Sequence, residues 1–125
     1  LNITFHSQLD KNGEPTVSRA FLNRIYKEAS EGSQKDLLVY SERQNVSADL
    51  IGSMAACTLE AHETHTRTGF LTLSKEVLAA SGVSLEDDIS LPVTHAKIFG
   101  WYDNELGSYV NCLSRLTKYV DQQLI

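Results

Sequence analysis

Cysteine is scarce in this sequence. The two cysteines, Cys57 and Cys112, lie far apart in the chain and form no C-x-x-C pair. This pattern argues against a disulfide framework and against the common zinc and dithiol redox motifs. One disulfide between them stays open, although reduced thiols in a cytosolic protein are the simpler interpretation.

Positive charge is also in short supply. Lysine and arginine number 11 against 16 aspartates and glutamates, so the net charge is −5. A protein that wraps nucleic acid needs a basic stripe, and the basic residues here are scattered. The sequence therefore argues against a nucleic-acid partner, and it offers no basic cluster to a membrane surface.

Long apolar runs and glycine-rich loops are missing as well. No run approaches the ~20 apolar residues of a membrane-spanning helix. Asn2, His6 and Gln8 interrupt the apolar residues at the N-terminus, so we expect no signal peptide. No Gly-rich loop follows a strand-like run, so the sequence holds no dinucleotide-binding fingerprint. The chain starts at Leu1 rather than Met, which favours a fragment of a longer protein, although a processed product would look the same.

The apolar content suits one domain with a buried core, because 42% of the 125 residues are apolar. Apolar and polar residues alternate over residues 1–9, which predicts a half-buried strand, and residues 10–15 form a turn. Thr16 or Ser18 can cap a following helix that runs to about Glu31. Gly32 is expected to end that helix in the left-handed conformation.

Three short strands are predicted next, over residues 37–40, 46–51 and 54–61, from their β-branched and alternating apolar residues. A long packing helix is predicted from Leu106 to about Gln122, because apolar residues recur there on one helical face. The order of strand, helix, several strands and helix predicts an α+β domain with a mixed or mostly antiparallel sheet.

The stretch from Lys97 to Gly107 has the most distinctive sequence. Residues 97–102 are aromatic and β-branched, which predicts a strand. Asp103 is expected to cap the following helix, and Glu105 to lie in its first turn, where the helix dipole favours a carboxylate. A strand that runs into a capped helix places polar side chains at a rigid corner, where small ligands are often held.

The run Trp101-Tyr102-Asp103-Asn104-Glu105-Leu106-Gly107 resembles the Trp-Tyr-Asp-Asn-Glu-x-Gly signature of glyceraldehyde-3-phosphate dehydrogenases. Upstream, residues 27–32 and 46–49 resemble the helix, Glu-Gly turn and Val-Ser-x-Asp segment of that family. The chain departs from the family at Ser33, where a proline is usual, and at Ala56-Cys57, where two serines are usual. The resemblance covers most of the chain and maps it onto the second half of the family's catalytic domain.

This resemblance carries several expectations. It implies helices packed on one face of a sheet and subunit contacts on the other. Residues 1–125 would be the C-terminal part of the catalytic domain, with the NAD-binding domain absent. Residues 67–92 exceed the family's connection and are expected to be a surface insertion, in which Ser74 caps a short helix that Gly82 stops and Pro92 breaks the regular structure after it.

Asn104 is the one cofactor-binding residue that we predict. A carboxamide can pair with another carboxamide, and in the family the Asn of this motif binds the nicotinamide carboxamide of NAD. The alternative role is a helix-start Asn that bonds its own backbone. The residue after Gly107 is usually a Tyr near the nicotinamide, whereas this chain has Ser108. Tyr109 cannot simply replace it, because a one-residue shift turns a helical side chain by ~100°.

No catalytic residue and no metal ligand is predicted in this chain. Cys57 and Cys112 are interpreted as small apolar core residues. His6 is interpreted as a solvent-side strand residue, and His62 with His65 has metal-like spacing but no third ligand. By resemblance, the nucleophilic Cys and the base His of the family would lie upstream of Leu1.

Two hypotheses for function stay open. The first is the C-terminal part of a cytoplasmic, NAD-dependent enzyme that oxidises glyceraldehyde 3-phosphate, or a related sugar-phosphate aldehyde, with phosphate as co-substrate. Its partners would be its own NAD-binding domain and further copies of itself, a tetramer by resemblance, and the fragment alone would be inactive. The second is a non-enzymatic oligomerisation or binding module that kept the fold.

Overall fold

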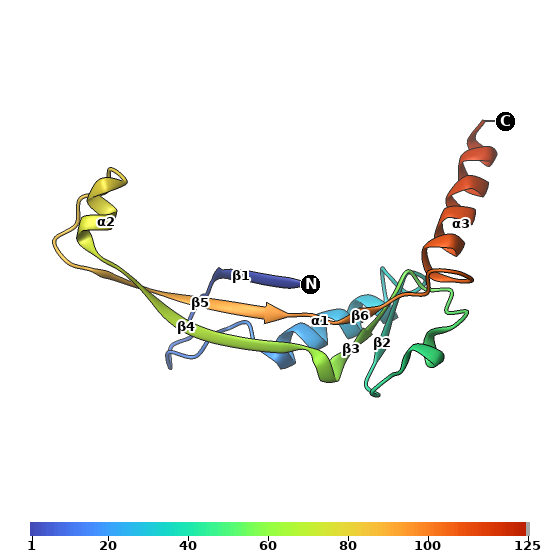
Figure 1. The fold of residues 1–125 in the computed structure, drawn as a ribbon, viewed down its shortest axis with the longest axis horizontal. Helices are drawn as coiled ribbons and strands as arrows, with labels where there is room; N and C mark the ends of the chain where they lie inside the picture. The colour runs from blue at the N-terminus through green and yellow to red at the C-terminus, as the bar shows by residue number, and fades with distance from the viewer. Residues whose placement is uncertain (125) are drawn as a thin grey trace.

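A computed structural model of the chain describes residues 1–124. In these residues two three-stranded sheets, ordered β1–β5–β4 and β2–β3–β6, combine with three α-helices. The predicted α+β fold is therefore confirmed, with the strands divided between two sheets. Figure 1 shows an elongated molecule in which the β4–β5 hairpin reaches one end and α3 stands at the other.

The larger sheet is antiparallel and has β5 at its centre. β1 (Asn2–His6) and β4 (His65–Leu73) pair with the two edges of β5 (Ile89–Lys97). The short helix α2 (Lys75–Ala80) joins β4 to β5 at the far end of the hairpin. β1 therefore closes the sheet only near the base of the hairpin, and the hairpin extends beyond it.

The smaller sheet carries the distinctive stretch of the sequence. β2 (Leu38–Ser41) runs parallel to β3 (Cys57–Glu60), and β3 pairs antiparallel with β6 (Gly100–Trp101). Two 3₁₀ turns, η1 (Ser47–Leu50) and η2 (Ala61–Glu63), flank β3 in sequence. The smaller sheet thereby brings residues 58–59 and residues 100–101 together.

The first two helices begin where the sequence predicts. α1 (Arg19–Glu31) is capped by Ser18, whose Oγ accepts from the Phe21 N–H at 3.1 Å. α2 is capped in the same way by Ser74, and Gly82 follows it with φ +82°. These caps and the helix-stopping glycine are confirmed. α3 (Ser108–Gln123) ends within one residue of its predicted end.

Other local predictions are wrong. Residues 46–51 form a 3₁₀ turn rather than a strand, because the Asp49 carboxylate accepts from the Val46 N–H at 2.8 Å and offers the backbone a local alternative to a ladder. Gly32 has φ −116°, so the chain leaves α1 without a left-handed residue. The strand over 54–61 is confined to β3, and that over 97–102 is split between the end of β5 and β6.

Pro92 does not break the regular structure, contrary to expectation, but lies inside β5 opposite Phe70. Its carbonyl accepts from the Ser7 N–H at 2.8 Å, on the β1 side of the strand. A residue's N and C=O point to the same side of a strand, so the proline nitrogen faces Ser7 rather than β4, and the β4 ladder loses no bond. The position left without a donor lies opposite Ser7, just past the end of β1 at His6.

The core is small. The buried apolar residues are Leu50, Ala55, Leu59, Ala61, Ala96 and Ile98. The accessible surface is 9015 Å², whereas a compact monomer of 13.9 kDa exposes roughly 6,700 Å². Exposed apolar side chains include several on α3, where Leu113 and Leu116 are 59% and 56% exposed. None of the helices in residues 1–124 is long and apolar enough to span a bilayer.

A buried cluster of three hydroxyls ties the larger sheet together and yields a first prediction. Thr94 Oγ1 bonds to Ser7 Oγ and, at 2.6 Å, to Thr68 Oγ1, and Thr94 is fully buried. Thr94→Val should lower the free energy of unfolding by about 1–3 kcal/mol, because it leaves buried hydroxyls without a partner. Urea unfolding of the intact protein measures this change. Thr72→Val, an exposed change on β4, is the control and should stay within about 0.5 kcal/mol.

Candidate functional site

The loop after β6 is held by one carboxylate. Asp103 Oδ2 accepts from the Gly52 N–H at 2.8 Å, and Oδ1 accepts from the N–H groups of Glu105 and Leu106 at 2.9 and 3.4 Å. These backbone donors, that of Glu105 first, hold the pKa of Asp103 below its usual range. Asp103 therefore fastens the loop both to itself and to the turn after η1.

Asp103 is not the helix cap that the sequence predicts. α3 starts later, at Ser108, with Gly107 in the capping position, and Glu105 precedes the helix rather than lying in its first turn. The carboxylate bonds to Gly52, which is distant in sequence, so local spacing could not reveal its role. The region from Asp103 to Gly107 is a loop in front of the helix.

Ser108 adds a second contact between the same two segments. The contacts of Asp103 and Ser108 with Gly52 and Ser53 are called the clamp below. The Ser108 N–H donates to the Ser53 carbonyl at 2.6 Å, and its Oγ accepts from the Asp103 N–H at 2.7 Å. Ser108 is 1% exposed and has φ +43°, a left-handed conformation that a serine adopts only when its surroundings fix it. A Cβ at Gly107 would overlap the Ser53 carbonyl, so only glycine fits there. No sequence pattern indicates this structural role of Ser108.

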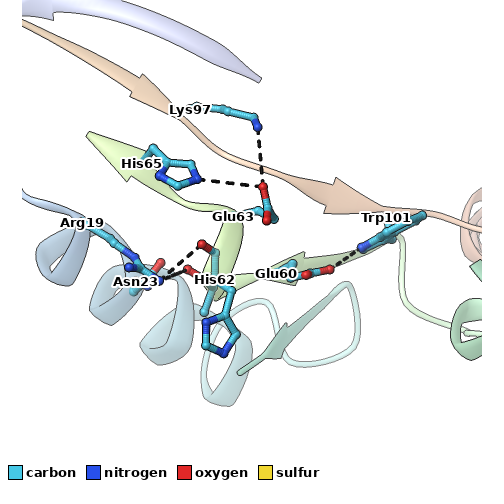
Figure 2. A network of polar contacts seen from close by, with 9 residues as sticks. Arg19, Asn23, Glu60, His62, Glu63, His65, Lys97 and Trp101 are labelled. Carbon is cyan, nitrogen blue, oxygen red and sulfur yellow. Dashed lines mark hydrogen bonds and ion pairs between the residues drawn. The ribbon is translucent and has the colours of Figure 1, made fainter. Parts of the chain in front are cut away.

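β6 is anchored by a buried carboxylate on β3. The Trp101 Nε1–H donates to Glu60 Oε2 at 2.7 Å (Figure 2). The Asn45 backbone N–H and side-chain amide both donate to the same oxygen at 3.3 Å. Burial alone would raise the pKa of Glu60, but the bonds from Trp101 and Asn45 outweigh it and leave the pKa lowered. The indole also packs edge-to-face on Phe99, with ring centroids 5.2 Å apart.

Asn104 lies at the exposed part of this clamped loop. It lines a depression of about 380 Å³ with Trp101, Tyr102 and the η1 residues Ser47 and Leu50. Among residues 1–124 no group bonds to its carboxamide, whereas the neighbouring Asp103 carboxylate is fully used. The carboxamide can therefore pair with a ligand, and the depression lies at the small end of the range for small-molecule sites.

The two cysteines are free thiols and lie outside this depression. Cys57 is half-buried against β6, and burial raises the pKa of its thiol. A raised pKa disfavours the thiolate, the form that acts as a nucleophile. Cys112 is half-buried on α3. This environment suits the interpretation of Cys57 as a packing residue.

The histidines do not gather into a site. His65 Nε2 lies 3.9 Å from the Glu63 carboxylate, which is also 3.6 Å from Lys97 Nζ, while His62 points to the other side of the chain (Figure 2). His6 is exposed on β1. Within residues 1–124 no group of three His, Cys, Asp or Glu side chains could hold a metal ion.

No family model matches this chain. Curated relatives do match. The chain is 32% identical over 108 residues to glyceraldehyde-3-phosphate dehydrogenase 2 of Streptomyces avermitilis, which is 86% of the chain and 25% of that protein. It is 35% identical over 109 residues to the glyceraldehyde-3-phosphate dehydrogenase of Streptomyces coelicolor, again over 86% of the chain and 25% of that protein. It is 33% identical over 104 residues to glyceraldehyde-3-phosphate dehydrogenase 1 of Bacillus subtilis, which is 83% of the chain and 24% of that protein.

These matches confirm the resemblance that the signature indicates. The chain spans about a quarter of the length of the curated relatives, as a C-terminal piece of the catalytic domain would. In the structure, residues 67–92 form the outer part of the β4–β5 hairpin together with α2.

The close approach at Gly107 gives a second prediction. Gly107→Ala should lower the free energy of unfolding by about 1–3 kcal/mol, because the new methyl group must displace the Ser53 backbone. Glu105→Ala changes an exposed residue of the same loop and is the matched control, with an expected effect below about 0.5 kcal/mol. Equal unfolding midpoints for the two variants in the intact protein would refute the close approach.

The lowered pKa of Asp103 gives a third prediction. A carboxylate with a depressed folded pKa stabilises the protein above its unfolded pKa, and that stability is lost as pH falls through the folded value. Stability should therefore decline as pH falls below about 4, where the unfolded chain binds the proton that the lowered pKa of folded Asp103 resists. Asp103→Asn should weaken the intact protein at pH 7 and reduce this decline. Urea unfolding at pH 7 and pH 3 measures both, and parallel pH curves for the two proteins would contradict the clamp.

Proposed function

We propose that this chain belongs to an NAD-dependent enzyme of the glyceraldehyde-3-phosphate dehydrogenase type, because it is similar to about a quarter of the length of such enzymes. Its own contribution is Asn104, which binds the carboxamide of the nicotinamide ring. One observation carries this role. Asn104 presents an unpartnered carboxamide from a clamped loop, next to a depression of about 380 Å³.

The chemistry of the carboxamide supports this choice. Asn104 offers two N–H donors and one carbonyl acceptor, so it can form a reciprocal pair with the carboxamide of the cofactor. Such a pair fixes which face of the ring meets the substrate. NAD supplies the hydride acceptor when it is bound. The clamp through Asp103 and Ser108 then acts as positioning, because it limits the directions that Asn104 can take.

The remaining chemistry belongs to residues outside this chain. In an enzyme of this type a cysteine thiolate attacks the aldehyde carbon, hydride leaves that carbon, and phosphate displaces the thiol from the resulting thioester to give an acyl phosphate. Burial raises the pKa of the Cys57 thiol, and Cys57 lies outside the depression beside Asn104, so it does not suit this role. We therefore expect the nucleophile, its base and the sugar-phosphate aldehyde site elsewhere in the protein, and no activity from residues 1–125 alone.

The exposed surface of this chain favours contacts with another domain or with further copies of the protein. The apolar face of α3 is exposed, and the total accessible surface exceeds that of a compact monomer by roughly 2,300 Å². A dinucleotide-binding domain of the same protein and further copies of the chain would cover such a surface. We place this protein in the cytoplasm, where free thiols such as Cys57 and Cys112 persist.

A second candidate function rests on Ser108. Ser108 is buried in the clamp, where the family usually has a Tyr near the nicotinamide, so that contact is missing. A module that keeps the fold for assembly and no longer binds NAD is compatible with this change. The two functions differ in whether the protein binds NAD.

NAD binding gives the fourth prediction. NAD should raise the melting temperature of the intact protein by mass action. Asn104→Ala should weaken NAD binding roughly tenfold, because it removes a hydrogen-bonding pair worth about 1.4 kcal/mol. Asn2→Ala removes an exposed carboxamide on β1, outside the depression, and is the matched control, which should bind NAD as the wild type does. An unchanged melting temperature with NAD would favour the assembly module, and equal affinities of wild type and Asn104→Ala would remove Asn104 from the site.

A further inference from the structure

The smaller sheet has an open edge. In the strand order β2–β3–β6, β2 pairs with β3 on one side and with no strand of residues 1–124 on the other. An edge strand presents a row of backbone N–H and C=O groups with which an extended chain can pair. The edge of β2 is therefore a surface to which a further strand can be added.

The ladder between β2 and β3 shows which backbone groups face this edge. Cys57 N–H donates to the Leu37 carbonyl at 3.2 Å in a parallel arrangement. Backbone groups of successive strand residues alternate in direction, so the odd-numbered residues of β2 face β3, whereas Leu38 and Tyr40 face the open edge. The Leu38 N–H is used locally, by the Gln34 carbonyl at 2.8 Å. The Leu38 carbonyl and both backbone groups of Tyr40 have no partner in residues 1–124.

A groove lies beside this strand. α1 contacts β2, and together they form a depression of about 530 Å³ that we call the β2 groove. The Tyr40 side chain turns toward α1, where Lys27 Nζ lies 6.0 Å from the centre of its ring. Side chains on the same face of an added strand would also lie against α1. The groove is lined from α1 by Lys27, Ser30 and Glu31, and otherwise by Lys35 and residues 38–43.

The charges of the β2 groove favour carboxylates. Lys27 is paired with Glu42, with 3.0 Å between Nζ and Oε1. Lys35 before β2 and Arg43 after it are exposed and form no ion pair within residues 1–124. With Glu31, the lining residues are three cations against two carboxylates, a net charge of +1 in a chain of net charge −5. The two unpaired cations flank the free backbone groups on either side.

We propose that the open edge of β2 binds an extended acidic segment of another protein as a fourth strand. The segment bonds to the Leu38 carbonyl and to the N–H and C=O of Tyr40, three bonds in either strand direction. Its β-branched side chains on one face lie toward α1. Because the four residues of β2 span ~13 Å, carboxylates five positions apart, roughly 17 Å, meet Lys35 and Arg43 beyond its two ends.

The same two cations exclude other occupants. In an antiparallel pair of β2 edges, Lys35 of one copy would lie near Arg43 of the other, and like charges opposite each other repel. A basic segment of another protein would be repelled in the same way. A short edge strand with charges at its ends also discourages pairing with uncharged strands. The acidic ends of the segment therefore decide which strand is accepted.

This site is separate from the proposed NAD site. The β2 groove shares no lining residue with the depression beside Asn104. Peptide binding at β2 and NAD binding at Asn104 are therefore separate results, and the failure of one leaves the other standing.

A synthetic peptide gives the fifth prediction. Fluorescent acetyl-Glu-Thr-Val-Thr-Val-Glu-amide should bind the intact protein, and salt should weaken this binding. The same peptide with Lys at both ends should bind at least about tenfold more weakly. In an added strand only every second N–H points to β2. N-methylation of both valines or of both threonines should therefore differ, one weakening binding at least about tenfold and the other less than about threefold.

Variants of the chain place the peptide on β2. Tyr40→Pro removes the outward N–H, which the ladder with β3 does not use, so an edge strand tolerates it. It should bind the acidic peptide at least about tenfold more weakly than Tyr40→Ala, which keeps that N–H. Lys35→Glu and Arg43→Glu should each weaken binding about tenfold, whereas Lys11→Glu, an exposed change before α1, should leave it unchanged.

Three results would overturn the proposal. The first is no binding of the acidic peptide by the intact protein, which includes the case in which another segment of that protein already covers β2. The second is equal loss of affinity in the two N-methylated peptides, a comparison that uses only the wild-type protein. The third is equal binding by Lys35→Glu, Arg43→Glu and Lys11→Glu.

Discussion

The Asp103 carboxylate is the interaction on which the candidate site depends. It accepts three backbone N–H groups, and one of them, from Gly52, belongs to a segment about 50 residues earlier in the chain. Ser108 and Gly107 add a second contact between the same two segments, through Ser53. Because both ends of the loop are fixed, Asn104 is presented from a rigid corner although it is itself exposed.

Local features of the fold can be predicted from the sequence, and long-range ones cannot. The caps Ser18 and Ser74 and the end of α3 follow from side chains and their near neighbours, and the structure confirms them. The predicted start of α3 is wrong, since the local bonds of Asp103 to Glu105 and Leu106 lie in a loop and the helix begins only at Ser108. The prediction for Pro92 is wrong because its tolerance depends on where β1 ends. The signature sequence locates the site, but the clamp that Ser108 forms is visible only in three dimensions.

The small core and the large exposed surface have a common explanation. The chain is similar to about a quarter of the length of a larger enzyme, and we propose that parts outside these 125 residues complete its core. The exposed apolar face of α3 suits a contact with another domain of the same protein, and α3 begins directly after the loop that holds Asn104.

The most direct test of the central claim compares two ligands on two proteins. The ligands are NAD and an NAD analogue that lacks the nicotinamide carboxamide, and the proteins are the intact wild type and Asn104→Ala, measured by calorimetry. If Asn104 binds the carboxamide, the wild type prefers NAD by about tenfold and the variant shows no preference. If both proteins prefer NAD by the same factor, another residue binds the carboxamide, and the proposed role of Asn104 is wrong.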